Sequence, residues 1–403
     1  MLRRSRAARH HSEMTSAPVP SSPLDAARSL YTTLSDASPR IEAERRLPPD
    51  IVAALKASRL FRLCVPERYA GLEASPATLV ECVAELARAD GSAGWCVAIG
   101  ATSGLLGGYL PDADAKEVYA SDPDSVAGGV FAPKGKAVAE GESYRVRGRW
   151  AFASGIQHCS WLMGGCVVFE DGKPLTLPGG LPDSRLVVYP AAEAVVHDTW
   201  SVSGLCGTGS HDMEVSDVLV PRTRSVSLMS DRPRIESALY KFPVFGCLAI
   251  GIAAVSLGLA RRAIDELVEL AGGKTPAASR RTLAERGYVQ MQIAEAEAAQ
   301  RSARAFLLDT IGEIYEHASR GNDIELRQRA LLRLAATHTV TLSKRAVDAM
   351  YDAGGGSSIY RSSPLQRCFR DVHTASQHMI ISSSTLELAG RVFAGLETDA
   401  WQL

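Results

Sequence analysis

Residues 144–152, YRVRGRWAF, mark the point where a helical chain becomes a β-sheet. Charged and large apolar side chains alternate along this segment, so its period is two. Such alternation is typical of a strand that has one solvated face and one buried face. We expect the buried face to carry Tyr144, Val146, Trp150 and Phe152, and the solvated face to carry Arg145, Arg147, Arg149 and Ala151.

Four similar short segments follow, separated by Gly, Pro and Asp. They are WLMGGCVVF (161–169), SRLVVYP (184–190), AEAVVHDTW (192–200) and DMEVSDVLVP (212–221). Several short strands at such intervals predict a small sheet or barrel. We therefore expect a β domain over residues 125–235.

The chain on both sides of this region has a helical period. Residues 25–124 form the expected N-terminal helical domain, and 236–403 the expected C-terminal bundle of four helices, at about 247–271, 283–319, 325–352 and 365–395. The fold class predicted is α+β, mainly α. We interpret the Arg-rich residues 1–24 as a disordered leader, with Met14 as an alternative start, rather than as a transit peptide.

The composition argues against several classes of partner. Lys and Arg number 44 against 45 Asp and Glu, so no bulk charge attracts nucleic acid or an anionic membrane. We expect no apolar run to reach the roughly 18 residues that span a bilayer. The eight cysteines lie far apart without a CxxC pair, and we expect reduced thiols in a cytoplasmic protein and no metal site.

Two features of the C-terminal region suggest chemistry. The break DAGGGSSIYRSSP (352–364) gathers backbone N–H groups and hydroxyls where an anion such as phosphate could bind, although a plain flexible loop is an equal alternative. After it, His373 and His378 are expected on one helix. A spacing of five residues places them about 140° apart, so they cannot both face one atom.

Several stretches resemble the acyl-CoA dehydrogenase superfamily in the order found there. They are LFRLCVPERYAGLEASPATLVECVAELARADGSAGW (60–95), WSVSGLCGTGSHDMEVSDVLVP (200–221) and LAERGYVQMQIAEAEA (283–298). The resemblance covers most of the chain after residue 40. It implies that family's fold: an N-terminal helical domain, a central β-barrel domain and a C-terminal four-helix bundle.

Four shorter motifs are similar to the group D, two-component flavin-dependent monooxygenase branch, which includes p-hydroxyphenylacetate hydroxylase oxygenase, dibenzothiophene monooxygenase and indole-3-acetate monooxygenase. They are GSAGW (91–95), WAFASG (150–155), GTGS (207–210) and SPLQRCFRDVHTASQH (363–378). A dehydrogenase needs a carboxylate base over its flavin. Met379 occupies one position where the superfamily places that base, and FPVFGCLAIG (242–251), at the other, has no carboxylate.

The resemblance also implies roles for individual residues. Ser154 would hydrogen-bond flavin N5, His378 would face the flavin, and His373 would lie at the pocket rim or a subunit contact. Each of these residues has a plain structural role as its alternative. The remaining implied cofactor-binding residues are Phe152, Ala153, Ser210, Arg280, Arg281, Ser357 and Ser358, with the arginines and the Ser-rich loop reaching the phosphate from a neighbouring subunit of a homotetramer. The implied substrate-binding residues are Trp95, Ser103, Gly129, Phe131 and His378; Ser103 replaces a substrate-binding histidine.

The function implied is that of an oxygenase component. A separate flavin reductase would supply reduced, diffusible FMN, with FAD less expected, and O2 would form a C4a-hydroperoxyflavin that hydroxylates a small aromatic or indolic substrate. The chain has no GxGxxG fingerprint between a strand and a helix, so it depends on such a partner for electrons. The alternatives are an FAD-dependent acyl-CoA dehydrogenase, an N- or S-oxygenating monooxygenase, and a member that only binds ligand.

Overall fold

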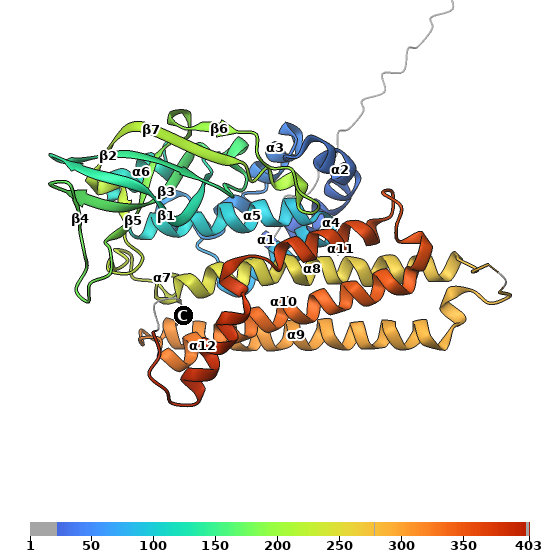
Figure 1. Ribbon diagram of the computed structural model, residues 1–403. Coiled ribbons are helices and arrows are strands. Elements are labelled where there is room, and N and C mark those ends of the chain that lie inside the picture. The colour runs from blue at the N-terminus through green and yellow to red at the C-terminus, as the bar shows by residue number, and fades with distance from the viewer. Residues whose placement is uncertain (1–21, 278, 400–402) are drawn as a thin grey trace, which may run out of the picture.

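The computed structural model describes residues 22–277, 279–399 and 403, arranged as helices, a sheet and helices (Figure 1). The predicted leader, apart from its last residues, lies outside this range. The fold class is confirmed: the protein is mainly helical, with one sheet in the middle of the sequence. The N-terminal helices are α1 (Pro23–Ser29), α2 (Tyr31–Glu44), α3 (Pro49–Ala57), α4 (Pro76–Ala89), α5 (Gly91–Ser103) and α6 (Asp112–Tyr119).

One eight-stranded sheet follows, in the order β6-β7-β2-β1-β3-β5-β8, with β4 paired to β3. Strands β1 and β3 run parallel and the other pairs are antiparallel. The strands are β1 (Ala127–Glu140), β2 (Ser143–Trp150), β3 (Trp161–Glu170), β4 (Lys173–Pro174), β5 (Ser184–Pro190), β6 (Val195–His197), β7 (Asp212–Pro221) and β8 (Ser225–Val226).

Strand β2 shows the predicted alternation, with one exception. Tyr144, Val146 and Trp150 are buried, and the Trp150 indole donates to the carbonyl oxygen of Gly165 at 2.8 Å. Phe152, expected on the buried face, is instead 70% exposed. The strand ends at Trp150, and Phe152 has a left-handed φ of 69° that turns its ring outward. The period-two pattern therefore fails where the strand stops.

Helices α7 (Ala238–Lys241), α8 (Val244–Gly273), α9 (Gly287–Ser319) and α10 (Leu326–Gly354) lead into and build most of the C-terminal bundle. Helix α8 lies at the centre of the molecule, packed against α4 and α5 on one side and α10 on the other (Figure 1). Contrary to our expectation, α8 is long and apolar enough to cross a membrane by length and composition, but most of it is buried in the described protein, as in the core helix of a soluble protein.

The fourth bundle helix, expected over 365–395, is broken. It consists of α11 (Pro364–Ala375) and α12 (Ser383–Phe393), with a short 3-10 turn at Met379–Ile381 between them. The Ser376 hydroxyl bonds back to the carbonyl oxygen of His373 at 2.8 Å, an alternative to the helical ladder that serine favours. The prediction that His373 and His378 share one helix was wrong, because His378 lies in this break.

Candidate active site

Trp95 is the side chain around which the candidate site is built. Its helix, α5, begins at a cap in which Asp90 Oδ1 accepts from the backbone N–H of Ala93 at 2.9 Å. Gly94 lets α5 approach α4, since a Cβ there would lie 2.6 Å from the Cβ of Ala87. All residues of α5 are buried except Ile99, one turn beyond Trp95. The helix therefore presents Trp95 and Ile99 on one face.

A chain of hydroxyl groups begins at Trp95. The indole Nε1–H donates to Ser154 Oγ at 3.0 Å, and Ser154 Oγ lies 2.7 Å from Ser210 Oγ. Ser210 Oγ in turn lies 2.7 Å from Thr208 Oγ1, which donates to the carbonyl oxygen of Leu205 at 2.8 Å. Ser154, Ser210 and Thr208 are all buried. Residues from α5, the end of β2 and the loop before β7 thus form one hydrogen-bonded network.

His378 lies beside the Trp95 ring. The two ring centroids are 5.9 Å apart and the planes are tilted by 58°. His378 Nδ1 accepts from the backbone N–H of Ile380 at 3.2 Å, so in the neutral imidazole the proton resides on Nε2. Burial, with Arg333 nearby, lowers the pKa of His378 to about 4. At neutral pH this side chain is therefore an uncharged hydrogen-bond donor.

Arg333, which the sequence interpretation did not single out, holds the turn that contains His378. It is a buried residue of α10, and its Nη2 donates to the carbonyl oxygen of Ile380 at 2.6 Å. Burial lowers the pKa of Arg333 to about 10, so it remains a cation at neutral pH. A charged residue within the apolar run LLRLAA (331–336) was the available signal.

The structure places His373 outside this cluster. Its Nε2 lies 2.8 Å from Asp348 Oδ1 of α10, and its ring packs on Phe369 with centroids 4.5 Å apart. The predicted catalytic role of His373 has no geometric support, because its ring faces α10 rather than Trp95. A rim or subunit-contact position remains a prediction.

Other predicted residues lie around the network. Phe152 is exposed beside Trp200, with ring centroids 6.1 Å apart, and the backbone N–H of Ala153 bonds to the carbonyl oxygen of His211. The start of β1 passes Ser154, because a Cβ at Gly128 would lie 3.7 Å from the Ser154 carbonyl oxygen. Gly129 and Phe131 follow on β1, where the pairing with β3 shifts register between Val130 and Gly135. Trp200 was not foreseen.

Ser103 differs from its predicted role. It is buried at the end of α5, and its hydroxyl donates to the carbonyl oxygen of Ile99 at 2.8 Å. A hydroxyl turned back onto its own helix is a poor substrate ligand. Ile99, which the sequence interpretation missed although it follows Trp95 by four residues, is the more accessible side chain of this face.

The predicted phosphate-binding residues gather at the end of the bundle. Lys274 Nζ donates to the Gly354 carbonyl oxygen at 2.8 Å and ties the end of α8 to the Gly-rich loop. Arg280 and Arg281 are exposed there. Helix α8 touches Ala98 of α5 at Gly251 and then continues to Gly273, about 33 Å further. Within one chain these arginines cannot reach the Trp95 network.

Ser357 and Ser358 differ in what they offer a phosphate. Ser357 is partly accessible. Ser358 is fully buried, and its hydroxyl donates to the carbonyl oxygen of Tyr351 at 2.7 Å. The Ser358 hydroxyl therefore stabilises the turn after α10, and a contact between Ser358 and the cofactor remains a prediction.

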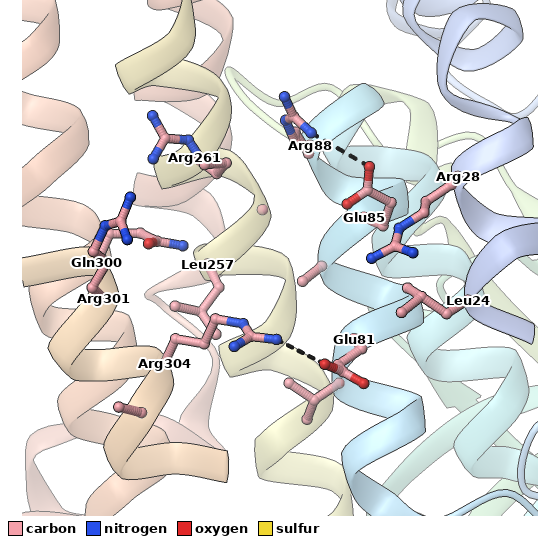
Figure 2. A pocket seen from close by; sticks show the side chains of 14 residues that line it. Leu24, Arg28, Glu81, Glu85, Arg88, Leu257, Arg261, Gln300, Arg301 and Arg304 are labelled. Carbon is pink, nitrogen blue, oxygen red and sulfur yellow. Dashed lines mark hydrogen bonds and ion pairs between the residues drawn. The ribbon is translucent and has the colours of Figure 1, made fainter. Parts of the chain in front are cut away.

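A hollow of about 450 Å³ lies elsewhere, between α1, α4, α8 and α9 (Figure 2). Several arginines line it, but they pair with carboxylates, as in Arg304 with Glu81 at 2.7 Å and Arg261 with Glu297 at 2.7 Å. This is a balanced ion-pair network rather than an anion site. Within the described part of the chain, no group of three His, Cys, Asp or Glu residues is placed to hold a metal ion.

Asp371 of α11 supports the loop that carries Thr208, and it gives a prediction about stability. Its Oδ1 accepts from the backbone N–H of Leu205 at 2.6 Å, and burial raises its pKa from 3.8 to about 7. The folded protein therefore binds more protons than the unfolded chain between these values, and stability from this group is lost as the pH rises toward 7. We therefore expect the free energy of unfolding, measured with urea, to fall between about pH 5 and pH 8 in the wild type. In Asp371→Asn this fall should be smaller by about 1–3 kcal/mol.

The control for that measurement is Asp309→Asn, an exposed position on α9, which should keep the wild-type pH dependence. An Asp371→Asn protein whose stability varies with pH as in the wild type would show that this carboxyl does not titrate near neutrality.

Comparisons with known proteins find relatives that cover most of the chain. The acyl-CoA dehydrogenase N-terminal domain model matches residues 25–112, and the C-terminal domain model matches 250–383. The chain is 34% identical over 355 residues to an indole-3-acetate monooxygenase of Pseudomonas putida, covering 88% of this chain and 89% of the relative. It is 28% identical to the oxygenase component of an FADH(2)-dependent resorcinol hydroxylase of Rhizobium sp., covering 88% and 90%.

Solved structures resemble the whole chain. The 3-HSA hydroxylase from Rhodococcus sp. RHA1 superposes with a TM-score of 0.88 at 27% identity, covering 95% of this chain and 99% of the other. XiaF from Streptomyces sp., solved in complex with FADH2 and glycerol, superposes with a TM-score of 0.86 at 26% identity, covering 94% and 96%.

Proposed function

Since the chain belongs to the acyl-CoA dehydrogenase family, and within it to the flavin-dependent monooxygenases, we propose that it is the oxygenase component of a two-component enzyme that hydroxylates a small aromatic or indolic compound. The observation that carries this proposal is the cluster of Trp95, Ser154 and His378. It combines an aromatic wall, a hydroxyl and a neutral donor, with no carboxylate base at position 379 or in 242–251.

The residues present fit a flavin ring. Ser154 Oγ is buried, and beyond its bonds to Trp95 and Ser210 it can make one more hydrogen bond, to a ligand. Phe152 and Trp200 offer apolar surface at the same strand end. Bound in reduced form, a flavin supplies the two electrons that activate O2 and so allows one oxygen atom to be transferred to the substrate.

The protein's part is to orient the reactants and to shield them from water. Ser154 would hydrogen-bond the reacting edge of the flavin. The rigid Trp95 indole would form a flat surface on which a planar substrate stacks. His378 would donate its Nε2–H to negative charge that develops on oxygen. A carboxylate base, as a dehydrogenase uses, would disfavour that charge.

We propose an aromatic or indolic substrate because Trp95, Ile99 and His378 together offer a flat, mostly apolar surface with one donor. The relative named for indole-3-acetate supports an indolic compound. Oxygenation at nitrogen or sulfur remains the alternative reaction for the same fold.

The cofactor is a flavin, and FMN was expected from the sequence. One relative is named as FADH(2)-dependent and one neighbour was solved with FADH2, which supports FAD instead. One relative is named as an oxygenase component, which supports a separate reductase as the electron donor.

We also propose that the flavin site is completed by a second copy of the chain in a homotetramer. Arg280 and Arg281 are exposed about 30 Å from the Trp95 network, a distance that a neighbouring copy must bridge if they bind the phosphate. Ile359 and Tyr360, both largely exposed at the same bundle end, would then be covered by that copy. The eight free thiols suit a cytoplasmic location.

Anaerobic titration of the purified protein with reduced FMN, with reduced FAD and with an acyl-CoA tests the proposal. We expect one of the reduced flavins to bind stoichiometrically, with no bleaching of oxidised bound flavin by the acyl-CoA. Bleaching by the acyl-CoA would instead identify a dehydrogenase. Stoichiometric flavin binding followed, once O2 is admitted, by no O2 use that depends on substrate would identify a binding protein.

A further inference from the structure

The hydroxyl chain from Thr208 to Ser154 has a direction that geometry fixes. The carbonyl oxygen of Leu205 is an acceptor only, so the 2.8 Å contact with Thr208 Oγ1 uses the single hydroxyl proton of Thr208. Ser210 must then donate to Thr208, because the oxygens are 2.7 Å apart and Thr208 has no second proton. By the same reasoning Ser154 must donate to Ser210 at 2.7 Å.

Trp95 closes the other end of the chain. Its indole Nε1 is a donor only, and it donates to Ser154 Oγ at 3.0 Å. Ser154 therefore accepts one hydrogen bond from Trp95 and donates its own proton to Ser210. The Ser154 hydroxyl can then only accept a hydrogen bond from a ligand, through its remaining lone pair.

That direction matters for the two redox forms of a flavin. Reduced flavin carries a hydrogen on N5 and is a donor there, whereas oxidised flavin has a lone pair on N5 and is an acceptor. A serine whose proton is already committed can bond to the first form but not to the second.

We propose that Thr208 is a positioning residue that sets the direction of this hydroxyl chain, so that Ser154 accepts from the N5–H of reduced flavin and the site binds the reduced form in preference to the oxidised form. The inference rests on the proposed function, since it takes Ser154 as the residue at N5. It adds the group that decides whether Ser154 accepts or donates.

The surroundings hold Thr208 firmly in this role. Leu205 has a left-handed φ of 50°, its N–H donates to Asp371 Oδ1 at 2.6 Å, and its carbonyl oxygen also accepts from the Trp200 indole at 3.2 Å. The carbonyl that ends the chain is thus fixed by the buried Asp371 and by Trp200. It stays paired when the Thr208 hydroxyl is removed, so the loop should keep its shape.

The test is Thr208→Val, which keeps the side-chain shape and removes the hydroxyl. Without it the Ser210 proton is free to turn to Ser154, and the Ser154 proton becomes free for oxidised N5. We measure dissociation constants for oxidised and reduced FMN and FAD with the full-length protein and take the ratio, oxidised over reduced, for the tighter flavin. We expect this ratio to fall about five- to tenfold.

Three further variants isolate the cause. Thr208→Ser restores the hydroxyl and should restore the wild-type ratio. Ser210→Ala removes the middle hydroxyl of the hydroxyl chain, to which Ser154 donates, and should lower the ratio as Thr208→Val does. Thr339→Val removes another buried hydroxyl that bonds to a main-chain carbonyl, that of Ala303 at 3.3 Å, and should leave the ratio unchanged.

An equal ratio in wild type, Thr208→Val and Ser210→Ala would overturn the proposal while leaving an enzyme that still binds reduced flavin. A fall that Thr208→Ser does not reverse would also overturn it, since the change would then come from packing rather than from the hydroxyl. A wild-type protein that binds neither reduced flavin would overturn the proposed function itself.

Discussion

Ser154→Ala is expected to convert the protein from an oxygenase into one that mainly releases hydrogen peroxide. The substitution removes the hydroxyl that we propose bonds to the flavin edge. It also leaves the Trp95 Nε1–H, now without its 3.0 Å acceptor, unpaired in a buried place. Removing one such polar contact from a reacting centre typically costs about 10²–10³ in rate. We expect the rate of hydrogen peroxide release per reduced flavin to rise at least tenfold, measured by a peroxidase-coupled assay.

The matched control is Ser256→Ala. Ser256 is a fully buried serine of α8 whose hydroxyl donates to the carbonyl oxygen of Ile252 at 3.2 Å, away from the network. It should release hydrogen peroxide at the wild-type rate. Equal hydrogen peroxide release from Ser154→Ala and Ser256→Ala would show that Ser154 does not contact the flavin.

His378→Ala is expected to reduce oxygenated product by about 10²-fold, because it deletes the neutral Nε2–H donor beside Trp95. With indole-3-acetate as the probe, the loss should appear as product per flavin oxidised, while binding of reduced flavin changes little. His378→Asn, which retains a side-chain donor, should recover part of the product.

The pH dependence distinguishes this role from that of a base. The pKa of His378 is lowered to about 4, so this residue does not change its charge between about pH 5 and pH 8. The yield of product per flavin oxidised should therefore show no pH dependence from His378 over that range. Since the unfolded chain binds the proton more readily, stability from this histidine is present above pH 6.5 and is lost as the pH falls toward 4. A yield of product per flavin oxidised that rises between pH 6 and pH 7, as an ionising histidine would give, would contradict a neutral donor.

Much of the fold followed from periodicity. The alternation in 144–150 identified the sheet, and the long apolar patterns identified the bundle, because each reflects which face of an element is buried. The errors lie where elements end. Phe152 lies two residues after the end of β2, and His378 lies three residues after the end of α11. At such points the local backbone turn, and not the periodic pattern, decides where a side chain points.

The candidate site divides in the same way. Ser154, Ser210 and Trp95 lie in motifs that resemble the family, and the structure brings all three into one network. Thr208 stands in one of those motifs, but its role depends on the Leu205 carbonyl, which only the folded loop places within 2.8 Å. Arg333 acts on a turn that is 47 residues away in sequence, which no local pattern reveals.

The most direct test of the central claim needs no knowledge of the substrate. The protein loaded anaerobically with reduced flavin is mixed rapidly with oxygenated buffer, and O2 consumption is compared with the return of the oxidised flavin's visible absorbance. The account predicts that the absorbance returns at least tenfold more slowly than O2 is consumed in the wild type and in Ser256→Ala, and that this delay is lost in Ser154→Ala. Consumption of O2 and return of the absorbance in a single phase at one rate in the wild type would contradict it.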